Sequence, residues 1–154
     1  MKQKAFPLSQ VAEIQLSYNP KVKAVDRPKI SGVDDMYKIL LDNWDLELIQ
    51  LQEQFKIVLL NRANRIIGIC EISKGGFSET SVDAKVVFSI ALKGCASAII
   101  LVHNHPSGSL KVSKSDMLLT RKLIEGGKLL DIVVHDHFII TAEGFLSMAR
   151  EELI

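Results

Sequence analysis

The hydrophobic pattern begins with an alternation near the N-terminus. Apolar and polar residues alternate over 12–18, which is the period of a half-buried strand. A Lys-rich connection leads from there to Ser31, which precedes Asp34 by three residues. A serine followed three residues later by an acid is a helix-start signal, so we expect a helix that runs to about Asn43.

The middle of the chain predicts a hairpin, a helix and a buried strand. Residues 55–60 and 65–72 are strand-like and are separated by a short polar loop. A helix is expected over 83–92, with Gly94 placed to cap its end. Residues 98–102 then form an apolar run without alternation, which is typical of a strand covered on both faces.

The last third of the chain predicts one more helix and a broken strand region. Apolar residues at helical spacing indicate a helix over 116–125, which we expect Gly126-Gly127 to end. Strand segments follow at 132–134 and 138–140, interrupted by His135-Asp136-His137.

Length and composition fit one compact domain. The chain has 154 residues, of which 47% are hydrophobic and 24% are charged, the balance of an ordinary globular protein. Because helices and strands are intermixed, we expect an α/β fold in which helices pack on a sheet. Residues 1–30 are expected to form an N-terminal strand and connecting extension, and residues 31–154 the domain itself.

Charge and cysteine usage narrow the class of protein. The formal net charge is +1, so the whole molecule offers no strong field toward nucleic acid or a membrane. Cys70 and Cys95 each lie in an apolar run, so we expect both in the core rather than in a disulfide or a thiol metal site. No apolar leader or bilayer-length segment is visible, so the expected compartment is the cytoplasm and no membrane partner is expected.

One stretch carries candidate chemistry, namely His103-Asn104-His105-Pro106-Ser107-Gly108 with Ser113 and Asp116 downstream. His103 and His105 stand where the buried strand ends, and in extended backbone residues at this spacing point the same way. Ser113 is typical of a helix N-cap, and Asp116 at the third helical position can project its carboxylate back toward the two imidazoles. Two imidazoles and one carboxylate form a catalytic zinc set that leaves the fourth position for water.

The chemistry also needs a general base and an oxyanion donor. Zinc lowers the pKa of its bound water to about 7, and a base must accept the proton and deliver it to the leaving group. Glu53 precedes the strand at 55–60, which could lie beside the strand that ends at His103. From spacing alone, a solvent-facing Glu53 is an equally good interpretation. Ser113 is a candidate donor to the oxyanion in addition to its capping role.

A second His-x-His pair, His135 and His137, is the natural rival for the ligands. It lacks a following carboxylate in a comparable turn, so the first pair is favoured. Asp136 is a candidate to orient a metal-bound histidine from behind. Other metal, phosphate and serine-nucleophile signatures are absent from the sequence, and neither cysteine stands in a Pro-Cys-x-x-Cys pair.

The spacing of His103, His105, Ser113 and Asp116 resembles the JAMM (MPN-plus) metalloprotease signature. The longer string His-Asn-His-Pro-Ser-Gly, with Ser-Lys-Ser-Asp after it, is similar to the RadC branch of that superfamily, whose members are often labelled DNA repair proteins. The resemblance covers residues 30–148 and includes Glu53-Gln54-Phe55 and Asp136-His137.

The resemblance implies a JAB/MPN architecture related to the cytidine deaminases, with a mixed sheet flanked by helices. It implies one zinc ion held by His103, His105 and Asp116. It further implies that Glu53 is the acid that activates water and that Ser113 stabilises the oxyanion. The implied activity is that of a zinc metallopeptidase, which cleaves a peptide or isopeptide bond in a peptide or protein substrate.

Two other functions remain open from the sequence. One is a DNA-repair-associated or nucleic-acid-processing domain that uses the basic residues after the motif. The near-neutral charge and the missing helix-hairpin-helix region of RadC proteins argue against it. The other is a protein-binding module that has the fold and does little catalysis. No visible motif names the substrate or the oligomeric state.

Overall fold

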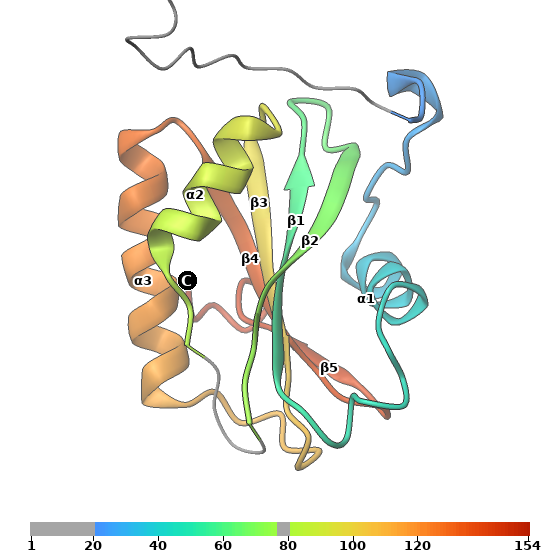
Figure 1. Cartoon of the computed structure of the whole chain (residues 1–154), viewed down its shortest axis with the longest axis vertical. Helices are drawn as coiled ribbons and strands as arrows, with labels where there is room; N and C mark the ends of the chain where they lie inside the picture. Colours follow the sequence, from blue (N-terminus) through green and yellow to red (C-terminus); the bar gives the residue numbers. More distant parts are fainter. Residues whose placement is uncertain (1–20, 77–80) are drawn as a thin grey trace, which may run out of the picture.

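The computed structural model describes residues 21–76 and 81–154, which fold as a sheet between helices (Figure 1). The helices are a short 3-10 helix, η1 (Ala24–Asp26), and α1 (Val33–Asp42), α2 (Ala84–Lys93) and α3 (Lys114–Leu129). The strands are β1 (Gln54–Leu60), β2 (Ile66–Lys74), β3 (Ala98–Asn104), β4 (Val133–Ile140) and β5 (Phe145–Ser147). Among these described residues, no helix is long and apolar enough to cross a membrane.

The sheet is mixed and has the strand order β2-β1-β3-β4-β5. Strands β3 and β4 run parallel, while β1–β2, β1–β3 and β4–β5 are antiparallel. Helix α1 covers one face, and α2 and α3 cover the other (Figure 1). This architecture confirms the expected single α/β domain with a mixed sheet flanked by helices.

The central strand β3 is apolar without alternation because both of its faces are covered. Ile99 and Leu101 belong to the core cluster formed with α2 and α3. Ile100 and Val102 belong to the cluster formed with α1. His103 continues the first series, so the strand directs its imidazole to the side of the sheet where α3 begins.

Two sequence-based helix boundaries were wrong. Helix α1 begins at Val33 with Gly32 at its N-cap, and the expected cap Ser31 instead donates its hydroxyl hydrogen bond to Asp35. Helix α3 continues through Gly126 and Gly127 to Leu129. A Cβ on Gly127 would lie 2.2 Å from the carbonyl oxygen of Ile132, so this glycine permits close packing on the next segment rather than ending the helix.

The strand β4 runs without a break through His135-Asp136-His137, so the expected interruption was also wrong. The pairing with β3 shifts there by one residue: Ile99 pairs with Val134, and Ile100 pairs with Asp136. The extra residue, His135, is accommodated as a bulge in a continuous strand. The expected strand over 12–18 lies outside the described residues, and the division at residue 30 stays a prediction.

The two cysteines differ. Cys70 is half-buried and packs against the α2–α3 cluster, as expected, whereas Cys95 is exposed, which contradicts its expected place in the core. Gly94 is the C-cap residue of α2 but keeps a right-handed conformation, and the left-handed residue is Cys95, with φ 52°. Cys95 thus lies in the turn that follows α2, where its thiol is exposed.

Candidate metal centre

The candidate ligands come from the end of β3 and the start of α3. His103 is 1% exposed, while His105 and Asp116 are half-buried. The Ser113 hydroxyl accepts a hydrogen bond from the Asp116 N–H (3.0 Å), and the Asp116 Oδ2 accepts one from the Ser113 N–H (2.8 Å). This reciprocal capping box was predicted, and it turns the carboxylate back toward β3.

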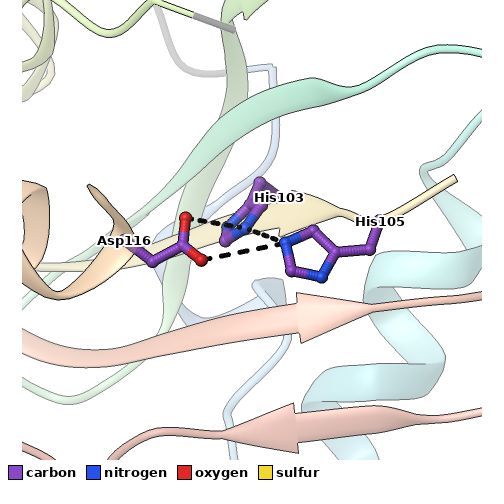
Figure 2. A group of neighbouring side chains, drawn as sticks. All are labelled: His103, His105 and Asp116. Atoms are coloured by element: carbon purple, nitrogen blue, oxygen red, sulfur yellow. Dashed lines mark hydrogen bonds and ion pairs between the residues drawn. The ribbon is translucent and has the colours of Figure 1, made fainter. Parts of the chain in front are cut away.

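The three side chains converge on one point (Figure 2). The His103 Nε2 lies 2.9 Å from the His105 Nε2 and 3.3 Å from the Asp116 Oδ1, and the His105 Nε2 lies 3.8 Å from the Asp116 Oδ2. Tetrahedral zinc with bonds of about 2.0–2.1 Å separates its ligand atoms by about 3.3 Å. The two separations measured from the His103 Nε2, 2.9 Å and 3.3 Å, lie near this value, so the donor set fits a zinc ion.

The hydrogen bonds around the ligands favour a cation between them. The His105 Nδ1 lies 2.7 Å from the carbonyl oxygen of Ser109, which can only accept, so Nδ1 carries the proton and the Nε2 of the neutral ring is bare. Burial alone raises the pKa of Asp116, but the His103 ring beside it and the two Ser113 bonds outweigh burial and hold that pKa well below its usual value. An ionised carboxylate therefore faces an imidazole lone pair.

Glu53 lines the groove that contains the candidate ligands. The groove measures about 830 Å³ and is lined by Glu53 together with His103, His105, Ser113 and Asp116. Phe55 pairs with His103 across the sheet, so the residues just before β1 lie beside the end of β3. The structure thus brings Glu53 to the cluster, as the adjacent-strand argument required, and its role as a base stays a prediction.

Asn104 fixes the segment that carries Glu53. This buried amide accepts a hydrogen bond from the Gln54 N–H (2.8 Å) and donates to the carbonyl oxygens of Ile49 (2.7 Å) and Gln52 (2.9 Å). The two residues that flank Glu53 are therefore tied to the residue between the two candidate histidine ligands. Ordering by Asn104 limits how far Glu53 can move from them.

The Ser113 hydroxyl is already engaged. It donates to the Asp116 Oδ2 (2.6 Å) and lies 2.9 Å from the Ser115 hydroxyl. One hydroxyl hydrogen cannot serve Asp116 and an oxyanion at once, so the oxyanion role requires the Ser113 hydroxyl to turn away from Oδ2. Because Oδ2 receives both Ser113 bonds, Oδ1 is the Asp116 oxygen that remains for an ion.

The family model described as "RadC-like JAB domain" matches residues 30–153. The chain belongs to the RadC-like JAB domain family. It is 42% identical over 124 residues to a UPF0758 protein of Salinibacter ruber, which covers 80% of this chain and 51% of that protein. It is 40% identical over 99 residues to one of Flavobacterium johnsoniae (64% and 43%) and 34% identical over 157 residues to one of Moorella thermoacetica (99% and 67%). The chain spans about half the length of the first two relatives.

In this RadC-like JAB domain, the rival histidines do not join the cluster. His137 is fully buried behind His103, with its Nε2 2.8 Å from the His103 Nδ1. The ring of His135 lies at the other end of β4, 3.3 Å from the Asn64 Oδ1. Asp136 accepts hydrogen bonds from Ser147 and from the N–H groups of His137 and Ala149, and because none of these residues is a candidate ligand, these bonds do not support Asp136 as the group that orients one. The neighbour of the ligand is His137.

Sequence reasoning about this RadC-like JAB domain missed Asn104 and Thr120. Both are fully buried polar residues at the site. A signal for Asn104 was present, because an amide inside a strand covered on both faces must find hydrogen-bond partners. Thr120 stands four residues after Asp116, where its hydroxyl can reach the Asp116 carbonyl oxygen, and it does so at 2.6 Å.

Proposed function

We propose that this chain is a zinc-dependent hydrolase that cleaves a peptide or isopeptide bond. One observation carries the proposal: two imidazole nitrogens and an ionised carboxylate converge at spacings that suit zinc, in a groove that Glu53 also lines. Catalytic zinc sites hold the ion with three protein ligands and leave a position open. Membership of the JAB-domain family supports a hydrolase.

His103, His105 and Asp116 would hold the ion. When bound, zinc supplies a Lewis acid that polarises a carbonyl group and acidifies water. The mixture of nitrogen and oxygen donors, with no thiolate among them, leaves the bound ion with the Lewis acidity that hydrolysis needs. The capping box supports this arrangement because it fixes the Asp116 carboxylate before any ion arrives.

The remaining chemistry belongs to Glu53 and Ser113. Glu53 accepts a proton from the attacking water and returns it to the amine that leaves, as general base and then general acid. The Ser113 hydroxyl turns from Asp116 and donates to the oxygen of the tetrahedral intermediate. Loss of one such donor lowers turnover by about 100-fold to 1,000-fold in comparable sites.

The groove suits a polypeptide chain. Phe55, Val82 and Leu119 supply apolar surface, and Lys111 and Lys114 supply positive charge next to the acidic centre. This combination can bind both the backbone and the acidic side chains of an extended segment. A nucleic-acid-processing role remains the alternative, for which the exposed basic residues of α3 are the candidate contacts.

The experiment is zinc analysis followed by a screen of peptide and isopeptide substrates with wild-type protein and Glu53→Gln. Glu53→Gln is expected to keep one zinc ion per chain and to lose at least about 100-fold in turnover, because general-base catalysis is worth about that much. Glu47→Gln is the matched control, since Glu47 is exposed and does not line the groove. Full turnover by Glu53→Gln with zinc bound would refute Glu53 as the base.

A further inference from the structure

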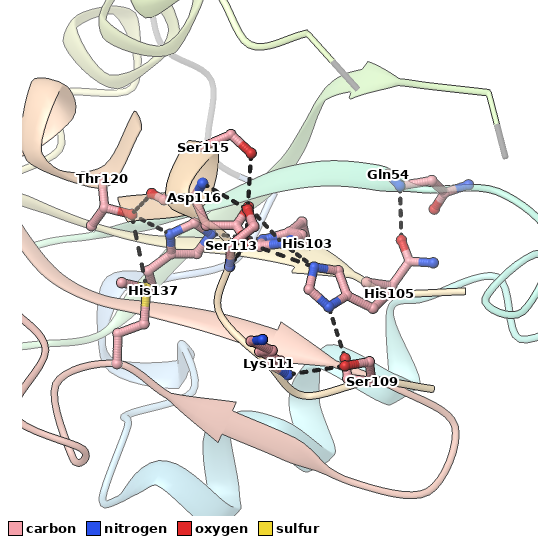
Figure 3. Close-up of polar contacts among 12 residues, drawn as sticks. Gln54, His103, His105, Ser109, Lys111, Ser113, Ser115, Asp116, Thr120 and His137 are labelled. Atoms are coloured by element: carbon pink, nitrogen blue, oxygen red, sulfur yellow. Dashed lines mark hydrogen bonds and ion pairs between the residues drawn. The ribbon is translucent and has the colours of Figure 1, made fainter. Parts of the chain in front are cut away.

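A buried ring lies directly behind the first candidate ligand and has no part in the proposed chemistry. His137 is fully buried, where burial disfavours a charged ring, and its two nitrogens face a ring nitrogen and a hydroxyl. A neutral imidazole carries one donor nitrogen and one acceptor nitrogen. Its two nitrogens contact His103 on one side and Thr120 on the other (Figure 3).

These contacts form a continuous hydrogen-bonded chain. The His103 Nδ1 lies 2.8 Å from the His137 Nε2, and the His137 Nδ1 lies 2.6 Å from the Thr120 Oγ1. The Thr120 hydroxyl lies 2.6 Å from the carbonyl oxygen of Asp116. The chain therefore starts at one candidate ligand of the ion and ends on the backbone of another.

The hydrogen-bonded series from His103 to the Asp116 carbonyl oxygen can be protonated in two self-consistent ways. In the first, every proton points away from the metal centre: His103 donates from Nδ1 to His137, which donates from Nδ1 to Thr120. The His103 Nε2 is then bare. In the second, every proton points toward the centre, and the His103 Nε2 carries a hydrogen that blocks a metal bond. Only the first arrangement leaves His103 able to bind an ion.

The last acceptor of this hydrogen-bonded series, the Asp116 carbonyl oxygen, selects the first arrangement. A carbonyl oxygen can only accept, so the Thr120 hydrogen is directed to it and the Thr120 oxygen is left to accept from His137. His105 does not need such a chain, because the Ser109 carbonyl oxygen contacts its Nδ1 directly. His103 achieves the same tautomer through two buried side chains.

We propose that His137 and Thr120 are positioning residues that hold the Nδ1 proton of His103 and thereby keep its Nε2 lone pair directed at the metal. The inference rests on the proposed metal site. It assigns two functions to Asp116: its carboxylate binds the ion, and its carbonyl oxygen sets the tautomer of the neighbouring ligand. Groups that hydrogen-bond a ligating histidine from behind typically change metal affinity by about 10-fold to 100-fold.

The first experiment measures the zinc dissociation constant by competition with a chromophoric chelator. His137→Leu removes the acceptor for the His103 proton, and we expect zinc affinity about 10-fold to 100-fold weaker. His137→Gln restores a carbonyl acceptor and is expected to recover most of the affinity. Far-ultraviolet circular dichroism checks that each variant is folded. A folded His137→Leu that binds zinc as tightly as the wild type would overturn the proposal.

Thr120 provides a second pair of variants if His137→Leu does not fold. Thr120→Val keeps the shape of the side chain and removes the hydroxyl, so the His137 Nδ1 proton loses its acceptor, and we expect about tenfold weaker zinc binding. Thr120→Ser keeps the hydroxyl and is expected to bind like the wild type. Equal zinc affinities for the Val and Ser variants would show that the Thr120 hydroxyl does not help to hold the His103 tautomer.

Nitrogen-15 NMR of the histidine rings in zinc-free wild-type protein tests the chain without a metal. A proton on the His103 Nδ1, coupled across the hydrogen bond to the His137 Nε2, is expected. A His103 ring protonated at Nε2 alone would overturn the inference whatever the zinc affinity. A wild-type protein with the expected coupling and no zinc binding would instead reject the proposed function and, with it, the metal-directed role of the chain.

Discussion

The two ends of the sheet carry similar residues and differ in how those residues are held. At the end where β3 finishes, His103, His105 and Asp116 converge in a groove of about 830 Å³. At the end where β3 begins, a larger cavity of about 1100 Å³ is lined by residues that include Arg62, Asn64, Lys128 and His135. Among the described residues, the larger cavity gathers no set of three ligand atoms. Convergence, rather than volume, distinguishes a candidate site.

The difference follows from where each His-x-His pair stands on its strand. The first pair spans the C-terminal end of β3, where the chain leaves the sheet and α3 can present a carboxylate. The second pair lies inside β4, so His137 is enclosed in the core and His135 is left near the far end. Because β3 and β4 are parallel, the buried member of the second pair comes to lie behind the first pair. One pair is thus placed to bind an ion, and half of the other supports it.

The largest expected effect comes from removing one histidine at each end. His105→Ala deletes a proposed ligand and is expected to abolish stoichiometric zinc binding, because only two of the three protein ligands remain. His135→Ala is the matched change at the far end, and its zinc content is expected to equal that of the wild type. Metal analysis after dialysis compares the two. Zinc retained by His105→Ala, or lost by His135→Ala, would reverse the roles of the two ends.

A smaller effect is expected from exchanging the residues between the histidines. Asn104→Asp turns an amide that donates to the Ile49 and Gln52 carbonyl oxygens into a buried carboxylate that faces them, which should cost about 3 kcal/mol or more in unfolding free energy. Asp136→Asn keeps an oxygen for the N–H groups of His137 and Ala149, so we expect a loss of about 1 kcal/mol.

Urea unfolding of the zinc-free proteins measures both exchanges. Asn104→Asp should also lower turnover beyond its effect on stability, because it releases the segment that carries Glu53. Asp136 holds the C-terminal turn rather than the groove, so Asp136→Asn should leave turnover near that of the wild type. Asn104 donates two hydrogen bonds that the Asp variant cannot make, so its stability loss should be the larger. Equal losses for the two variants would contradict this.

Much of the fold and the cluster could be predicted from the sequence. The unbroken apolar run before His103 identified a central strand, and the Ser113–Asp116 spacing identified the capping box that aims the carboxylate. Both are local patterns, whose geometry follows from the period of a strand or the first turn of a helix. Glu53 required more, because only the pairing of β1 with β3 brings it to the groove.

What the sequence could not supply depends on contacts between distant segments. Gly126-Gly127 is typical of a helix end, yet the helix continues because Gly127 packs against the backbone of Ile132. His137 was a rival ligand by its spacing, and only its register beside β3 places it behind His103. Tertiary packing decides such cases, since a local pattern does not specify which segment lies opposite.

The smallest expected effect concerns the start of β3, where no proposed function constrains the chain. Cys95 has φ 52°, and its N–H and that of Ala96 bond the Leu92 and Ala91 carbonyl oxygens, the pattern of a left-handed helix end. Cys95→Gly removes the Cβ that disfavours this conformation, but glycine also has more freedom in the unfolded chain. The expected net effect is an increase of about 0.5–1 kcal/mol in the unfolding free energy. Cys95→Ala keeps the Cβ and should gain nothing. Urea unfolding distinguishes the two variants, provided that the dependence of unfolding free energy on urea concentration is the same in both. Zinc affinity should also be the same in both, because Cys95 lies at the opposite end of β3 from the ligands. A change in affinity would show that the two ends are coupled.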